Sequence, residues 1–128
     1  MPWQVVFDDL FEAEFILFSA DVQDELLAHA LLLREYGPGL GRPTVDSLKG
    51  SQHSNMKELR FRHGREVWRV AFAFDPLRQA VLLVAGDKAG ADQRLFYKRL
   101  LEKANSRWNQ YLAELNLDIK EGRHGKKT

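Results

Sequence analysis

The chain of 128 residues contains no cysteine, four prolines and four histidines. Without cysteine it can form no disulfide bond, use no thiolate nucleophile and bind no zinc through sulfur. The histidines show no metal-ligand spacing, so we expect neither a metal nor a cofactor. No apolar run approaches the roughly 20 residues that cross a bilayer, and the N-terminus lacks the pattern of a signal peptide. These absences predict a cytoplasmic protein without a membrane partner.

Charged residues are plentiful, but their signs are unevenly distributed along the chain. Residues 1–36 contain eight acidic residues and one basic residue, whereas residues 37–128 contain ten acidic and eighteen basic residues. Such an asymmetry suggests that one side of the protein faces a polyanion such as nucleic acid. The alternative is two oppositely charged, solvated surfaces that bind no partner.

Hydrophobic periodicity predicts a single α+β domain over residues 1–116, with the element order β-α-α-β-β-β-α. The predicted strands are 3–7, 56–62, 66–74 and 79–85, and the predicted helices are 8–19, 21–37 and about 91–115. We expect an antiparallel sheet with the helices packed on one face. Residues 44–55 read as an irregular or extended connection, and residues 117–128 as a polar, basic tail that is a candidate for disorder.

Local signals mark the first two helices. Asp9 is the expected N-cap of the first helix, because Glu12 follows three residues later and Phe7 is available as a hydrophobic staple. Gly37 and Pro38 are expected to end the second helix. Both boundaries therefore follow from short sequence patterns.

The strands at 56–62 and 66–74 form a predicted hairpin in which two arginines face each other. A turn of two residues or of four gives the same register and places Arg60 directly across from Arg69. Like charges in such a pair destabilise the sheet by about 0.2–1 kcal/mol. Because Ala71 and Ala73 leave the same face small, we expect a shallow cationic hollow that accepts a phosphate through the planar arginine forks.

A plainer interpretation of the hairpin is that Glu58 and Glu66 neutralise both arginines in a solvated ladder. Three further positions are candidates for chemistry at this face, each with a structural alternative. Lys88 could stabilise a developing negative charge or be an ordinary loop lysine. Tyr97 could stack on a base or simply pack beside Phe96. His53 could exchange a proton near neutral pH or lie on the surface.

A cationic pocket of this kind could cleave RNA without a metal ion, because the 2′-OH is a built-in nucleophile. The protein has to align that hydroxyl, accept its proton, stabilise charge at phosphorus and help the 5′-oxygen leave. The general base stays open among His53, Asp87 and Lys88. Lys49, Lys57 and Arg62 would extend the positive strip along an RNA backbone.

Three stretches of the chain, taken in order, resemble a known group of proteins. They are "VDSLKGSQHSNMKELRFRHGREVWRVAFAFD", "VLLVAGDKAG" and "FYKRLLEKANSRWNQYL". The set resembles the RelE/ParE toxin superfamily and, more narrowly, the phage-derived HigB-like toxins of type II toxin–antitoxin modules. The resemblance implies a microbial-ribonuclease-like sheet and, in the HigB and RelE branches, endoribonuclease cleavage of mRNA in the ribosomal A site.

The resemblance also carries site residues, position by position. Arg60 and Arg69 match basic positions of the family on two adjacent strands, and Lys88 matches the basic residue after the last strand. Tyr97 corresponds to a C-terminal aromatic, although "DKAGADQRLFY" separates it from Lys88 by more residues than in RelE itself. The implied catalytic set is therefore Arg60, Arg69, Lys88 and Tyr97, with RNA contacts from Lys49, His53, Lys57 and Arg62.

The partners that the resemblance implies are the ribosome with its mRNA and a cognate antitoxin, a HigA-like helix-turn-helix protein. Two other functions remain alternatives. One is a gyrase inhibitor of the ParE branch, which would not require the two arginines and Lys88. The other is a non-catalytic nucleic-acid-binding module.

Overall fold

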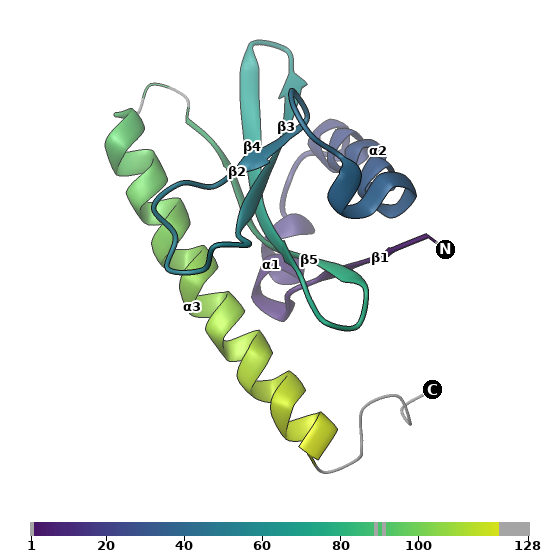
Figure 1. Ribbon diagram of the computed structural model, residues 1–128. Helices are drawn as coiled ribbons and strands as arrows, with labels where there is room; N and C mark the ends of the chain where they lie inside the picture. Colours follow the sequence, from purple (N-terminus) through teal and green to yellow (C-terminus); the bar gives the residue numbers. More distant parts are fainter. Residues whose placement is uncertain (1, 89, 91, 121–128) are drawn as a thin grey trace.

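Five strands form one sheet with helices on both of its sides (Figure 1). The computed structural model describes residues 2–88, 90 and 92–120. The elements are β1 (Gln4–Phe7), α1 (Asp9–Phe15), α2 (Ala20–Tyr36), the 3-10 helix η1 (Gly37–Gly39), β2 (Val45–Ser47), β3 (Lys57–His63), β4 (Glu66–Phe74), β5 (Gln79–Asp87) and α3 (Gln93–Lys120). The predicted α+β class is confirmed, and β2 is an additional strand.

The sheet has the strand order β1-β5-β4-β3-β2. Strands β2 to β5 pair antiparallel, whereas β1 runs parallel to β5. The expectation of a wholly antiparallel sheet was therefore wrong at one edge. Two helices and three other strands separate β1 from β5 in the sequence, so no hairpin dictates their relative direction.

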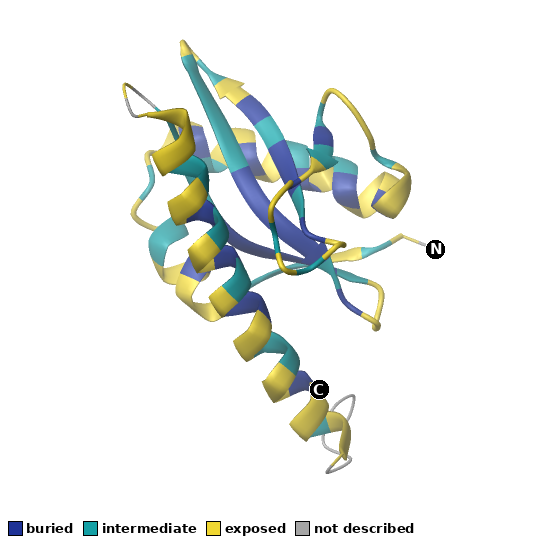
Figure 2. Cartoon of the chain, turned by 60° about the vertical axis from the view of Figure 1, so that its left-hand side comes forward, coloured by how far each residue is buried: buried dark blue, intermediate teal, exposed yellow. Residues whose placement is uncertain are grey.

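Helices cover both faces of the sheet, and the expectation of a single covered face was wrong. One core lies against α1 and α2 and includes Phe11, Leu26, Leu33, Val70 and Phe72. The other lies against α3 and includes Ala71, Ala73, Leu100, Ala104 and Trp108. Because both alternating sets of side chains in β4 are apolar from Val70 to Phe74, each face of that part of the strand needs a cover. Figure 2 shows the buried strands between these layers.

The N-cap of the first helix lies one residue before its predicted position. Asp8, and not Asp9, is the N-cap, and its carboxylate accepts hydrogen bonds from the backbone N–H groups of Leu10 and Phe11. Gly37 ends α2 as predicted, with a positive φ of 55°.

The last helix begins after Asp92, whose side chain accepts from the backbone N–H groups of Arg94 and Leu95. It continues to Lys120, so residues 117–120 are helical and do not belong to the predicted tail. The rest of that tail, residues 121–128, lies outside the described residues. No helix in the described part of the chain is long and apolar enough to span a membrane.

The connection between α2 and β3 is more ordered than its composition suggests. Val45–Ser47 pair with β3, and the following loop is attached to α3 by two side-chain hydrogen bonds. Ser51 donates to Asn105 at 2.7 Å, and His53 bonds Asn109 at 2.8 Å. Since Asn105 and Asn109 lie one helical turn apart, the loop follows the side of α3.

Replacing Gly37 by alanine should destabilise the fold by about 2 kcal/mol. The positive φ strains an L-residue there, and a Cβ at this position would collide with the indole ring of Trp3. Thermal unfolding measures the change. Gly39→Ala is the matched control, because nothing lies within 4 Å of its would-be Cβ. Equal melting temperatures for the two variants would contradict this account.

Candidate functional site

Arg60 and Arg69 lie side by side in the middle of the β3–β4 ladder, as the fourth of its seven residue pairs. The two residues are register partners, as predicted, so their side chains leave the same face of the sheet. Both line a cavity of about 550 Å³, to which Arg62 and Thr44 also contribute. Arg60 keeps 38% of its side-chain surface exposed. The pair is therefore not sealed by the helices.

Arg69 lies beneath two aromatic rings of α3. Its guanidinium carbon is 5.9 Å from the ring centre of Phe96 and 5.6 Å from that of Tyr97, distances at which a cation is attracted to a ring. Gly86 is its partner on β5, and a Cβ there would stand 3.3 Å from the Phe96 ring. The small residue thus leaves room for the stack.

The hydrogen-bond donors of Arg69 are only partly used within the described residues. One Nη donates to the backbone carbonyl of Val67 at 3.3 Å. The buried Nε has no hydrogen-bond partner among the described residues. Buried donors are nearly always paired in folded proteins, so the hydrogen bonding of this guanidinium is incomplete within the described residues.

Arg60 behaves differently, because a carboxylate holds it. Its Nε and Nη2 donate to Glu58 Oε1 at 2.9 and 2.5 Å, and Nη2 lies 3.8 Å from Asp46 Oδ2. The hydrogen bond to Glu58 raises the pKa of Arg60 above its ordinary value. The neutralising interpretation is therefore correct for Arg60. It is wrong for Arg69, because Glu66 instead accepts from the Trp68 indole at 3.0 Å.

Tyr97 completes the cluster from α3. Its hydroxyl donates to Glu58, at 3.1 Å from Oε2 and 3.3 Å from Oε1. Burial, assisted by the Glu58 charge, raises the pKa of Tyr97, so the phenol stays protonated as a donor at neutral pH. We call Glu58, Arg60, Arg69 and Tyr97 the arginine site. Sequence reasoning missed the bond between Glu58 and Tyr97, and no local pattern signals it.

The hollow expected beside Ala71 and Ala73 does not exist, because α3 packs on both residues and leaves them fully buried. The open space lies around Arg60 instead. Besides the cavity shared with Arg69, a cavity of about 290 Å³ is lined by Lys49, Glu58, Arg60, Gln93 and Tyr97, among others. The small side chains of β4 therefore allow α3 to pack closely on the sheet, and they do not form a binding surface.

Lys49, Lys88 and Arg62 surround the arginine site. Lys49 is exposed and lines the smaller cavity. The Lys88 ammonium lies 3.4 Å from the amide oxygen of Gln93, a residue of the same cavity wall. Arg62 is exposed and lines the larger cavity. The structure thus places Lys49 and Arg62 in the walls of cavities that Arg60 also lines, and Lys88 beside a residue of one of these walls.

Three other predicted residues lie elsewhere. His53 is bonded to Asn109, which follows Tyr97 by twelve positions on α3, about 18 Å along a helix. Lys57 alternates with Glu58 along β3 and so points to the opposite face of the sheet. Asp87 lines a different cavity, of about 390 Å³, together with Leu95 and other residues of α3. Neither His53 nor Asp87 lines the two cavities beside the arginine pair.

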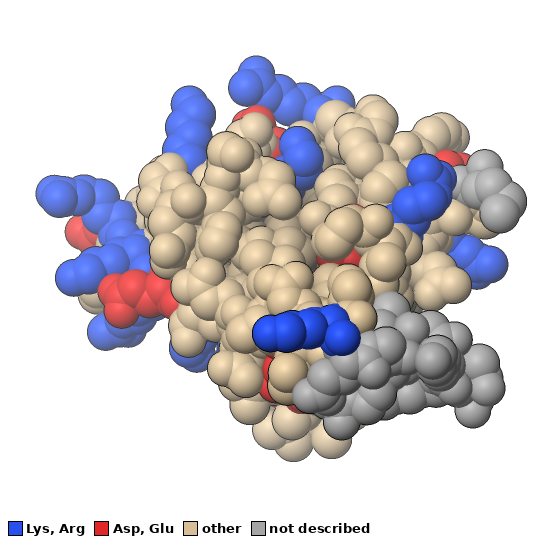
Figure 3. Space-filling view, turned by 60° about the horizontal axis from the view of Figure 1, so that its bottom comes forward, with Lys and Arg blue, Asp and Glu red and all other residues tan. Residues whose placement is uncertain are grey.

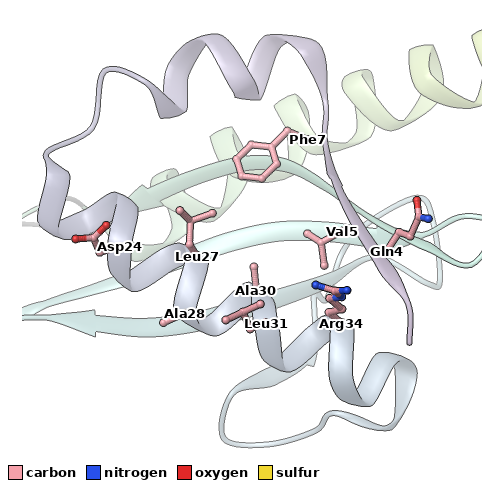
Figure 4. Close-up of a pocket in the computed structure, with 9 residues that line it drawn as sticks. All are labelled: Gln4, Val5, Phe7, Asp24, Leu27, Ala28, Ala30, Leu31 and Arg34. Carbon is pink, nitrogen blue, oxygen red and sulfur yellow. The ribbon is translucent and has the colours of Figure 1, made fainter. Parts of the chain in front are cut away.

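Two further views show the charges on one face of the molecule (Figure 3) and the cavity between β1 and α2 (Figure 4). On the face in Figure 3, most Lys and Arg side chains stand around the rim, with largely uncharged surface between them. A cavity of about 670 Å³ between β1 and α2, shown in Figure 4, is lined mainly by apolar residues such as Val5, Leu27 and Leu31. Within the described ranges, no group of three or more His, Asp or Glu is arranged to hold a metal ion.

Comparison with known proteins identifies the family. Residues 13–109 match the family described as "Phage derived protein Gp49-like (DUF891)". The chain belongs to this family. It is 44% identical over 97 residues to the Mycobacterium tuberculosis protein named "Putative toxin HigB2", an alignment that covers 75% of this chain and 47% of HigB2. It is 42% identical over 102 residues to "Putative toxin HigB3" of the same organism, covering 80% of this chain and 87% of HigB3.

This Gp49-like chain spans about half the length of HigB2 and most of HigB3. Its fold is also that of a solved structure, a mutant of the E. coli toxin RelE in the free state. The TM-score is 0.60 at 14% sequence identity, and the match covers 84% of this chain and 98% of RelE. The predicted relationship to HigB-like proteins and the predicted RelE-like fold are both confirmed.

Proposed function

We propose that this Gp49-like protein is the toxin of a type II toxin–antitoxin module and acts as a ribosome-dependent mRNA endoribonuclease. The observation that carries the proposal is the placement of Arg60 and Arg69 on one face of the sheet, both lining an open cavity. The names of HigB2 and HigB3, which describe toxins, support the biological role.

In the proposed reaction the arginine pair binds the scissile phosphate. Arg69 lines the open cavity and offers a planar fork, a geometry suited to phosphate oxygens. Lys88 adds positive charge where the pentacoordinate phosphorus becomes more negative, and preorganised charges of this kind stabilise a transition state. Lys49 and Arg62 bind flanking phosphates, while Tyr97 stacks on a base or donates a hydrogen bond. The reaction requires no metal ion.

The proposed partners follow from this role. The protein would act in the cytoplasm, where the ribosome presents mRNA in an extended form. A cognate HigA-like antitoxin with a helix-turn-helix domain would block access to the arginine site until it is removed.

Primer extension on an mRNA translated in a reconstituted system tests the proposal. We expect cuts within codons of the translated region that appear only when the purified protein and ribosomes are both present. An untranslated copy of the same mRNA is the control. Gyrase-linked DNA breaks without mRNA cuts would assign a gyrase inhibitor instead, and binding of RNA without either product would assign a non-catalytic module.

A further inference from the structure

Glu58 occupies an unusual position for a carboxylate. It lies on β3 with 2% of its surface exposed, between the guanidinium of Arg60 and the hydroxyl of Tyr97, and it belongs to the wall of the 290 Å³ cavity. An ionised carboxylate is costly to bury unless it is paired and hydrogen-bonded. Both partners of Glu58 are donors, so its two oxygens act as hydrogen-bond acceptors in this site.

The two oxygens of Glu58 are used unequally. Oε1 accepts both N–H groups from Arg60 and a longer bond from Tyr97, whereas Oε2 accepts only the Tyr97 hydroxyl within the described ranges. A carboxylate oxygen can accept two hydrogen bonds, so Oε2 retains capacity for one more. Arg60 gives Glu58 two of its five N–H groups, and the remaining ones can bind a phosphate beside it. A proton acceptor and a phosphate-binding group therefore stand next to each other.

We propose that Glu58 is the general base of the reaction, an inference that rests on the proposed ribonuclease function. Oε2 accepts the proton of the ribose 2′-OH as the 2′-oxygen forms a bond to phosphorus. The bond from phosphorus to the 5′-oxygen breaks, and that oxygen takes a proton from solvent water. The products are a 2′,3′-cyclic phosphate and a free 5′-OH, and Glu58 then returns its proton to solvent.

The other candidates for this role are less suitable. His53 is bonded to Asn109, and Asp87 lines the separate 390 Å³ cavity. The Lys88 side chain donates to the amide oxygen of Gln93. Asp46 also lines the 290 Å³ cavity. Its Oδ1 accepts from the Ser47 backbone N–H at 2.8 Å and lies 3.3 Å from Arg42. Its Oδ2 lies 3.8 Å from Arg60, a looser contact with that arginine than the bonds of Glu58 at 2.9 and 2.5 Å.

The test is the pH dependence of single-turnover cleavage on programmed ribosomes, between about pH 6.5 and 8.5, with Glu58→Gln. Glutamine preserves the size of the side chain and one oxygen for Arg60. We expect the wild-type rate to vary little over this range, because Glu58 and not hydroxide accepts the proton. The variant should be about 10²–10⁴-fold slower and should gain roughly tenfold in rate per pH unit, because hydroxide must replace the missing base.

Asp46→Asn is the matched control, since it removes a neighbouring carboxylate that also contacts Arg60, and it should retain a flat profile and a rate within a few-fold of wild type. A Glu58→Gln enzyme that is slower but equally flat would show that Glu58 only positions Arg60 and Tyr97, which overturns the inference. Unchanged cleavage by Glu58→Gln overturns it as well, while the nuclease function stands. If Glu58→Gln unfolds, Glu58→Asp replaces it and should cleave slowly at a rate that does not vary with pH. A tenfold gain in the rate of Glu58→Asp per pH unit would overturn the inference. A wild-type protein that cuts no mRNA overturns the function and the inference together.

Discussion

Replacing Arg69 by alanine is expected to lower the rate of mRNA cleavage by about 10²–10³-fold. Arg69 is one of the two cations proposed to hold the phosphate, and its Nε is a buried donor without a partner in the described structure. Without it, Arg60 is the one remaining member of the arginine pair at the phosphorus, and its own charge is shared with Glu58. Primer extension under single-turnover conditions measures the loss.

Two further variants separate this chemical effect from a loss of packing. Arg69→Met keeps an unbranched side chain beneath Phe96 and Tyr97. It should therefore lose as much cleavage activity as Arg69→Ala, while its melting temperature stays close to that of the wild type. Arg65→Ala removes an exposed arginine in the hairpin turn and should change cleavage by no more than a few-fold. Full activity in Arg69→Met would contradict the proposed role of the guanidinium.

Replacing Arg107 by leucine is expected to destabilise the fold by about 2–3 kcal/mol. Arg107 projects from α3 and is 9% exposed. Its two Nη atoms donate to the two carboxylate oxygens of Glu14 at 2.9 and 2.6 Å, and one of them also donates to the backbone carbonyl of Leu83 at 2.7 Å. The arginine thus connects α1, α3 and β5, and leucine would leave the Leu83 carbonyl buried without this donor. Denaturant unfolding gives the change in free energy.

At acid pH the free energies of unfolding of Arg107→Leu and the wild type should differ less than at neutral pH. The hydrogen bond from Arg107 lowers the pKa of Glu14 below its ordinary value of 4.5. The stabilisation is therefore complete above about pH 4.5 and is lost as the pH falls through the folded-state pKa. Arg99→Leu, an exposed change on the same helix, should shift stability by less than about 0.5 kcal/mol at any pH. If Arg107→Leu lowered the free energy of unfolding as much at about pH 3 as at pH 7, the ion-pair account would be contradicted.

The elements near the hairpin could be predicted because their signals are local. Turn length and the alternation of side chains place Arg60 opposite Arg69 without reference to the rest of the chain. A glycine followed by proline ends α2 for equally local reasons. The same alternation rule also places Lys57 on the other face, although its charge had suggested an RNA contact.

The errors concern contacts between distant segments. Ala71 and Ala73 looked like the floor of a hollow because nothing in β4 itself shows that α3 covers them. The expectation that the helices cover one face of the sheet was wrong for the same reason. Strand β2 was missed because three residues make too short a pattern, and its pairing with β3 is what orders it.

The amino-acid sequence by itself determined the family, the α+β class and the pairing of two arginines on one sheet face, since each depends on residue order or on neighbours within one hairpin. Only the tertiary structure decided which groups surround that pair. Glu58 meets Tyr97 across 39 positions of sequence, and His53 is drawn to Asn109 across 56. Both contacts form only when α3 packs across the sheet, and that packing is driven by burial of apolar surface, which does not specify polar neighbours in advance.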